Sequence, residues 1–155
     1  MAKYTATIGW QRNGATFSDK RYSRKHTWKF DGGSEVQASS SPNVVPVPLS
    51  DAAAVDPEEA FVASLSSCHM LWFLSIACEQ GFVVESYLDD AVGMMEKNSD
   101  GKLAMTKVIL RPTVSFAGPR LPTEQDFDEM HRKAHAECFI ANSVKSEVLC
   151  EPAMT

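Results

Sequence analysis

Hydrophobic and polar residues alternate along the first forty positions, as they do in strands that bury one face. The alternation runs through three segments, 4–10 (YTATIGW), 25–30 (KHTWKF) and 35–40 (EVQASS). Asn13-Gly14 and the Asp-Gly-Gly triplet at 31–33 supply turn signals between them. This pattern predicts an antiparallel meander of three strands.

Residues 41–55 (SPNVVPVPLSDAAAV) contain three prolines, which cannot donate backbone hydrogen bonds to a sheet. We expect this segment to follow a stiff, extended course. Because long loops in compact domains are often functional, it is a candidate wall of a binding pocket.

No formally charged residue occurs between Ala60 and Cys78, which predicts a helix buried through the centre of the molecule. Serines and His69 interrupt the apolar run and no second apolar segment follows, so we do not expect a membrane span. At about 100° per residue the apolar residues cover both sides of the helix. One side carries Phe61, Leu65, Cys68, Trp72 and Ile76, and the other carries Val62, Met70, Phe73, Leu74 and Ala77.

The start of this helix has a complete capping pattern. Asp56 fits the N-cap and Pro57 the first helical position. Glu59, three residues after the cap, can accept a bond from the Asp56 backbone N–H. Glu58 has no such role; it is either a carboxylate favoured by the helix dipole or a functional group.

The residue pattern of the C-terminal half predicts two long strands, 82–97 and 102–118, joined as a hairpin by the turn at 98–101 (NSDG). A second helix lies within 121–141, with Thr123 as N-cap and Asp126 in the first turn. Residues 143–148 form a short last strand. The element order indicates an α+β fold, with residues 1–155 forming a single domain.

Charge and composition narrow the possible partners. The net charge of −5 over 155 residues disfavours nucleic acid and anionic membranes, which both select basic surfaces. Small molecules and proteins remain. The N-terminus shows no export-signal pattern, so we expect a cytoplasmic protein with reduced cysteines.

Four cysteines, Cys68, Cys78, Cys138 and Cys150, are far apart and form no C-x-x-C pair. No structural zinc site is therefore expected, and no spacing supports a metal site built from Cys68, His69 and His26. We expect His26, His131 and His135 to be surface or strand residues, and Cys78 and Cys150 to be structural or incidental.

Cys138 shares one side of the second helix with Phe127, Met130 and Ala134. This side faces the core, where Cys68 also lies. The two cysteines are either coincidental core residues or a pair that forms a disulfide, which requires Cα atoms within about 7 Å.

Several motifs, in their order and spacing, resemble the OsmC/Ohr family of thiol peroxidases. They are DPEEAF (56–61), SSCHM (66–70), the long hairpin, and AHAECFIANSVKSEV (134–148). The resemblance implies an OsmC-like fold of antiparallel sheets around a central helix that carries the first cysteine, in an intertwined homodimer. It also implies reduction of organic hydroperoxides, with Cys68 as the peroxidatic cysteine, Cys138 as the resolving cysteine, and Glu58 orienting an arginine. The Cys68–Cys138 disulfide would be re-reduced by a dithiol, by resemblance a lipoyl-type one.

The attacking species is a thiolate, which an apolar site disfavours unless a cation is close. The family's arginine comes from the N-terminal hairpin region, where Arg12, Arg21 and Arg24 are available; we favour Arg24, at the start of a strand. Glu58 and Cys68 are ten residues apart, which is about 15 Å along a helix. Arg24 and Glu58 can therefore reach Cys68 only from a second subunit.

Three residues depart from the family pattern. Phe139 follows the second cysteine, where proline is usual, and bears directly on the position and reactivity of Cys138. Asp56 replaces a common asparagine. His69 stands where an aromatic residue is common, and its place about 100° round from Cys68 favours a polar residue with a local hydrogen bond.

Two functions compete on this sequence. The first is a thiol-dependent organic hydroperoxide reductase without a cofactor, since no flavin, haem or nicotinamide motif is present. A hydrophobic pocket containing Phe61, Met70, Trp72 or Phe139 would favour a bulky hydroperoxide. The alternative is a non-catalytic dimeric protein that binds or senses an apolar or electrophilic ligand.

Overall fold

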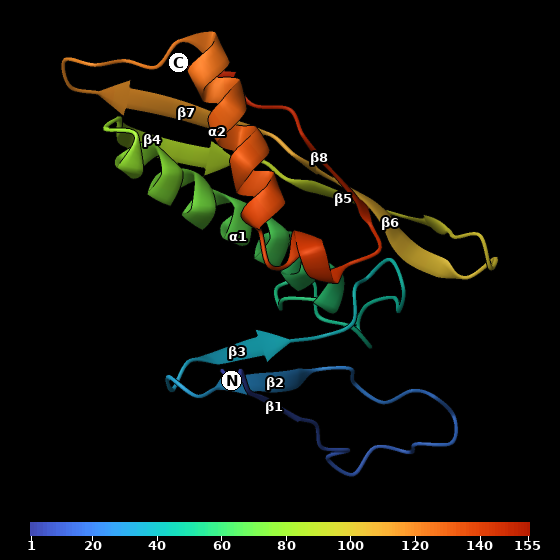
Figure 1. Ribbon diagram of the computed structural model, residues 1–155. Coiled ribbons are helices and arrows are strands. Elements are labelled where there is room, and N and C mark those ends of the chain that lie inside the picture. Colours follow the sequence, from blue (N-terminus) through green and yellow to red (C-terminus); the bar gives the residue numbers. More distant parts are fainter. The chain divides into compact units, whose positions relative to one another are not determined.

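The computed structural model describes all residues, Met1–Thr155, and divides into two compact units, Met1–Ala60 and Phe61–Thr155. Figure 1 shows small sheets in both units and the long helices of the chain. That residues 1–155 act as one domain stays a prediction.

The N-terminal unit contains the predicted three-stranded meander. β1 (Ala6–Gly9), β2 (His26–Phe30) and β3 (Glu35–Ala38) pair antiparallel in chain order. Asn13 and Gly14 both adopt positive φ, 50° and 79°, in the loop between β1 and β2. The alternating pattern therefore located all three strands to within two residues at each end.

The proline-containing segment 41–55 differs from the extended course we expected. It folds into successive turns, closed by backbone bonds such as Val44 N–H to Ser41 O (3.0 Å) and Leu49 N–H to Pro46 O (3.1 Å). Proline fits early turn positions because its φ is already restricted. The segment joins a strand only through an isolated bridge between Ala38 and Val55.

α1 (Pro57–Glu79) begins with the predicted cap. The Asp56 N–H donates to Glu59 Oε2 (3.1 Å), and the Glu59 N–H donates to Asp56 Oδ1 (2.8 Å). Gly81, with φ 78°, follows the end of the helix as expected. α1 is long and apolar enough to cross a membrane by length and composition alone, a weak indication because core helices of soluble proteins pass the same test.

The expectation that α1 is buried on all sides is only half right. Leu65, His69, Phe73, Ile76 and Ala77 are buried. The opposite face is open, with Leu71 61% exposed and Ser67, Ser75 and Cys78 also exposed. The serines that interrupt the apolar run thus mark the solvent-facing side of the helix.

The two long strands of the C-terminal unit are each broken in the middle, which the pattern did not predict. β4 (Val83–Asp89) pairs with β7 (Pro112–Ala117), and β5 (Val92–Lys97) pairs with β6 (Leu103–Leu110), all antiparallel. At the break, Asp89 Oδ1 accepts a bond from the Arg111 N–H (2.6 Å). This side-chain bond satisfies the Arg111 N–H at the point where the hairpin divides between two sheets.

The last strand begins later than predicted. Ala141–Ser143 forms a short 3₁₀ helix, η1, so β8 (Glu147–Cys150) starts at Glu147 and a further strand, β9 (Ala153–Met154), follows. β8 pairs in parallel with β6, and β9 in parallel with β7. The sheets are therefore mixed, with orders β4-β7-β9 and β5-β6-β8.

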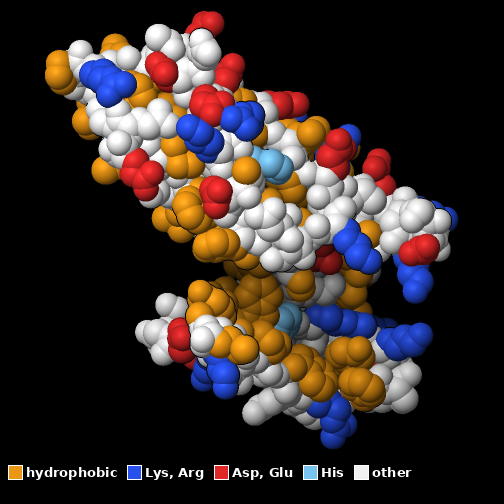
Figure 2. All heavy atoms as spheres, in the orientation of Figure 1, with side chains coloured by type: hydrophobic (Ala, Val, Ile, Leu, Met, Phe, Trp, Pro, Cys, Tyr) orange, Lys and Arg blue, Asp and Glu red, His pale blue; other side chains and the backbone are white.

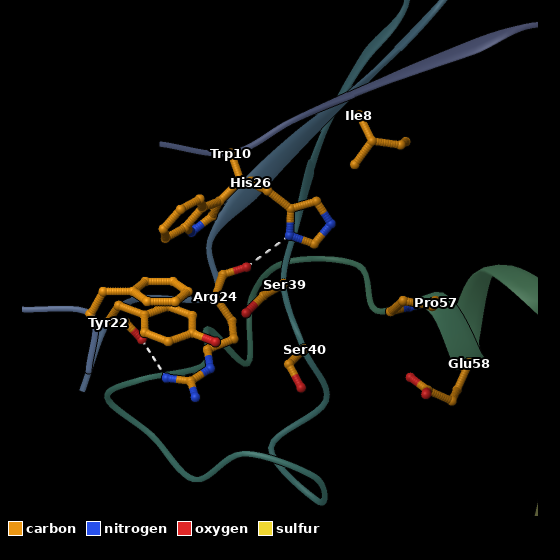
Figure 3. A pocket seen from close by; sticks show the side chains of 10 residues that line it. Ile8, Trp10, Tyr22, Arg24, His26, Ser39, Ser40, Pro57 and Glu58 are labelled. Carbon is orange, nitrogen blue, oxygen red and sulfur yellow. Dashed lines mark hydrogen bonds between the residues drawn. The ribbon is translucent and has the colours of Figure 1, made fainter. Parts of the chain in front are cut away.

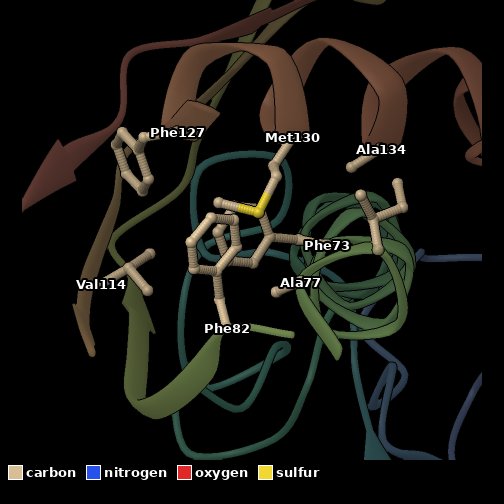
Figure 4. Packing of buried hydrophobic residues seen from close by; sticks show 8 residues of the cluster. Phe73, Ala77, Phe82, Val114, Phe127, Met130 and Ala134 are labelled. Atoms are coloured by element: carbon tan, nitrogen blue, oxygen red, sulfur yellow. The ribbon is translucent and has the colours of Figure 1, made fainter. Parts of the chain in front are cut away.

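α2 (Glu124–Glu137) packs with α1 over the main core. Figure 4 shows Phe127, Met130 and Ala134 of α2 facing Phe73 and Ala77 of α1, with strand residues closing the cluster. Cys138, Phe127, Met130 and Ala134 are all buried, which confirms the predicted inner side of the second helix. A smaller core is built around Leu65, Val108 and Leu110.

The capping box of α2 gives a stability prediction. The Thr123 hydroxyl accepts from the Asp126 N–H (3.1 Å), and the Thr123 N–H donates to Asp126 Oδ2 (2.9 Å). We expect Thr123→Ala to lower the free energy of unfolding by about 1 kcal/mol. Thr123→Ser keeps the hydroxyl and should cost much less. Urea unfolding of both variants measures the difference, and equal losses would show that the cap bond is not responsible.

Candidate active site

Cys68 lies half-buried on α1 and opens into an apolar hollow of about 280 Å³. Leu71, Trp72, Ser75 and Phe139 line the rest of it. The Trp72 and Phe139 rings meet edge to face, with centroids 5.5 Å apart. Two of the four residues expected to line an apolar pocket are therefore beside Cys68, including the phenylalanine that stands in place of the family's proline.

Cys138 is the C-cap residue of α2 and is 1% exposed. Its Sγ accepts a hydrogen bond from the Ala141 N–H (3.4 Å). Burial, and then the nearby Cys68, raise the pKa of the Cys138 thiol to about 11. Cys138 is thus a protonated thiol at neutral pH, and it lies close enough to Cys68 to interact with it. Both cysteines are free.

Arg24 and Glu58 line one pocket of about 510 Å³ within the N-terminal unit. Figure 3 shows Glu58 at the start of α1 and Arg24 among the aromatic side chains of the pocket. No ion pair joins the two. Arg24 Nη1 instead donates to the carbonyl oxygens of Lys20 (2.7 Å) and Tyr22 (2.5 Å), and its Cζ lies 3.9 Å from the centroid of the Tyr22 ring.

The other two candidate arginines do not line this pocket. Arg12 is exposed and donates to the Ala15 carbonyl (2.9 Å). Arg21 is exposed and contacts Asp19 through its backbone N–H (2.9 Å). Of the three, Arg24 is therefore the one that shares a pocket with Glu58.

The pocket that contains Arg24 and Glu58 has an aromatic and aliphatic wall. Trp10 and Tyr22 meet edge to face at 5.4 Å, and Phe17 stacks on Tyr22 at 4.6 Å. Hydrophobic side chains are also prominent on the visible surface of this unit (Figure 2). Among them, Ile8 is 60% and Phe17 54% exposed. The charged groups of the pocket thus stand beside an open apolar surface.

His69 does not make the local hydrogen bond that the sequence suggested. Its Nε2 lies 2.9 Å from Nδ1 of His131, 62 residues away on α2. His131 is buried, so its expected surface position was wrong. Helical spacing gives the signal that was missed: His131 follows the buried Met130 and lies three and four residues from Ala134 and Phe127.

The OsmC-like protein family matches residues 50–152, which is most of the chain. The protein belongs to the OsmC-like family. An OsmC-like protein of unknown function from Vibrio cholerae is 59% identical over 98% of this chain and 99% of its own, with a TM-score of 0.97. No curated protein matches the chain.

More distant solved structures share the fold at low identity. An organic hydroperoxide resistance protein from Elizabethkingia anophelis is 16% identical, with a TM-score of 0.69 over 100% of this chain and 96% of its own. The organic hydroperoxide resistance protein OhrB of Bacillus subtilis is 17% identical, with a TM-score of 0.61 over 99% of this chain and 98% of its own. The predicted α+β OsmC-like fold is confirmed.

Proposed function

We propose that this OsmC-like protein is a cysteine-based peroxidase that reduces organic hydroperoxides with electrons from a dithiol. The observation that carries the proposal is the pairing of Cys68, open to an apolar hollow, with the buried thiol of Cys138 beside it. Relatives of the same fold are named organic hydroperoxide resistance proteins, which supports the substrate class.

The reaction balances with the two cysteines alone. The Cys68 thiolate attacks one peroxide oxygen, the O–O bond breaks, and the alkoxide takes a proton and leaves as an alcohol. Cys68 is then a sulfenic acid. Cys138 displaces its hydroxyl as water and forms the Cys68–Cys138 disulfide, which a dithiol returns to two thiols. The raised pKa of Cys138 keeps it a thiol until Cys68 is oxidised, and its proton then leaves with the sulfenic hydroxyl as water.

The apolar hollow favours bulky hydroperoxides over hydrogen peroxide. Trp72 and Phe139 offer aromatic surface to an alkyl or aryl group, whereas hydrogen peroxide gains nothing from such contacts. We propose the cytoplasm, where dithiol reductants are available, as the place of the reaction.

In this proposal the protein acts as a homodimer, with Arg24 and Glu58 of one subunit serving Cys68 of the other. The support is the family resemblance and the ten-residue spacing of Glu58 and Cys68 on α1. Arg24 would stabilise the thiolate and the departing alkoxide, and Glu58 would hold its guanidinium. The carbonyl oxygens that now bind Arg24 would be exchanged in part for that carboxylate.

Mass analysis under non-reducing conditions tests the cysteine chemistry directly. After one equivalent of an organic hydroperoxide, we expect the reduced protein to lose two hydrogens and to yield a peptide crosslinked through Cys68 and Cys138. Cys138→Ser should instead accumulate sulfenic and then sulfinic acid on Cys68. A wild-type protein that reaches sulfinic acid while Cys138 stays free would exclude the resolving role.

The alternative function, a dimeric binding or sensing protein, is favoured by a different observation. The 510 Å³ pocket with Trp10, Phe17 and Tyr22 has the size and apolar character of a ligand site. Binding of an apolar ligand without consumption of hydroperoxide would support it. Catalytic turnover with a dithiol would exclude it as the sole function.

A further inference from the structure

Three buried or half-buried side chains that the peroxidase chemistry does not use converge in the C-terminal unit. They are His69 of α1, His131 of α2 and Cys150 of β8. We propose that they form a binding site for a divalent transition-metal ion of the zinc type. His69 Nε2 and His131 Nδ1 are 2.9 Å apart, and Cys150 Sγ is 3.7 Å from each nitrogen.

These separations are close to those around a tetrahedral zinc ion. Zinc binds imidazole nitrogen at about 2.0–2.1 Å and thiolate sulfur at about 2.3 Å, which places N and N about 3.3 Å apart and N and S about 3.6 Å apart. The two nitrogen–sulfur distances already match. The nitrogen–nitrogen distance needs to open by roughly 0.4 Å.

Aromatic packing holds the two imidazole rings in position. His131 stacks on Phe73 with centroids 4.2 Å apart and meets the edge of Phe127 at 4.6 Å. The His69 ring lies nearly parallel to His131, at 5.3 Å and 10°. His69 and His131 are 1% and 4% exposed. An ion would therefore meet ligands that are already oriented.

The polar contacts of both imidazoles point inward. His69 Nδ1 and His131 Nε2, the outer nitrogens, have no hydrogen-bond partner. The inner nitrogens face each other and Cys150. Without an ion, a hydrogen bond joins the two inner nitrogens. A shared cation would replace the proton of that bond and bind both nitrogens and the Cys150 sulfur.

The types of ligand favour a transition metal. Imidazole nitrogen and thiolate sulfur are ligands of zinc and similar ions, whereas magnesium and calcium prefer oxygen ligands. A bound ion would displace the proton of the Cys150 thiol, as transition metals do when they bind cysteine.

A hollow of about 290 Å³ opens beside two of the three side chains, His131 and Cys150. Asp128, Arg132 and His135 of α2 also line it. Zinc sites with three protein ligands take water as the fourth, and in this proposal the hollow is the side from which water would reach the ion.

Metal titration of the full-length protein tests the site. The reduced, chelator-stripped protein is titrated with Zn²⁺ against a chromogenic chelator, and with Co²⁺ by absorption spectroscopy. We expect one ion per chain, a thiolate-to-cobalt charge-transfer band and tetrahedral d–d bands. Zinc should also slow the alkylation of Cys150, located by peptide mass analysis.

Matched variants separate this site from the peroxidatic cysteines. Cys150→Ser and His131→Gln should weaken zinc binding by about 100-fold or more. The double variant Cys68→Ser/Cys138→Ser should bind zinc as the wild type does, whether or not the peroxidase proposal holds. Circular dichroism checks folding; if a ligand variant does not fold, alkylation of the wild-type protein decides. Absence of the thiolate band, or Cys150 alkylated equally fast with and without zinc, would overturn the proposal.

Discussion

Cys68→Ser is expected to reduce the turnover of an organic hydroperoxide with a dithiol by about 1000-fold or more. The serine hydroxyl keeps its proton at neutral pH and cannot attack the O–O bond as a thiolate does. The hollow beside Leu71 and Trp72 changes by little more than one atom, so the loss would reflect chemistry and not packing. A coupled assay that follows consumption of the hydroperoxide measures the effect.

Two cysteine variants serve as controls for this result. Cys78 is exposed near the end of α1, so Cys78→Ser should leave the turnover unchanged. Cys138→Ser should lower the turnover, because the sulfenic acid then has no resolving thiol within the protein and must react with the external dithiol. Turnover retained in Cys68→Ser would contradict the peroxidase assignment and favour the hypothesis of a binding protein.

Local sequence patterns predicted most of the helices and strands, because interactions between residues near one another in the chain determine where these elements begin and end. Alternation placed β1 to β3, and the capping residues Asp56 and Thr123 placed the starts of α1 and α2. Each of these features depends on residues that are close to one another in the sequence. Such features can be recognised without knowing what the rest of the chain does.

Long-range contacts account for what the sequence did not predict. At the point where the hairpin divides between two sheets, Asp89 bonds to the backbone of Arg111, 22 residues away, and no local pattern contains that bond. Periodicity placed Leu71 on α1 but did not show which face of the helix is covered by other elements. In the single chain Leu71 is 61% exposed.

The candidate site was predicted to a similar extent. Helical spacing correctly predicted that Cys138 faces the core, and in the structure Cys138 is buried near Cys68. His69 and His131 lie on two helices 62 residues apart, and Cys150 reaches them through the parallel pairing of β8 with β6. A parallel pairing that brings distant segments together gives no short-range signal, so this cluster was missed.

Mixed dimers should show whether the peroxidase site combines two subunits. Arg24→Ala alone is expected to lower turnover about 100-fold, because a cation that stabilises developing negative charge is lost. Cys68→Ser alone is inactive. A dimer of one Cys68→Ser chain and one Arg24→Ala chain, isolated with two affinity tags, should recover about half of the wild-type activity. One of its sites then contains both defects and the other contains neither.

The reciprocal dimer makes this prediction decisive. When Cys68→Ser and Arg24→Ala occupy the same chain and the partner chain is wild type, a composite site predicts that both sites fail: one lacks its thiol and the other lacks its arginine. Sites contained within single chains predict the opposite pattern, with this dimer half active and the first one nearly inactive. Because the two dimers contain the same substitutions in the same number, differences in expression or stability affect both equally. Their ratio of activities therefore reports which chain supplies the Arg24 that serves each Cys68.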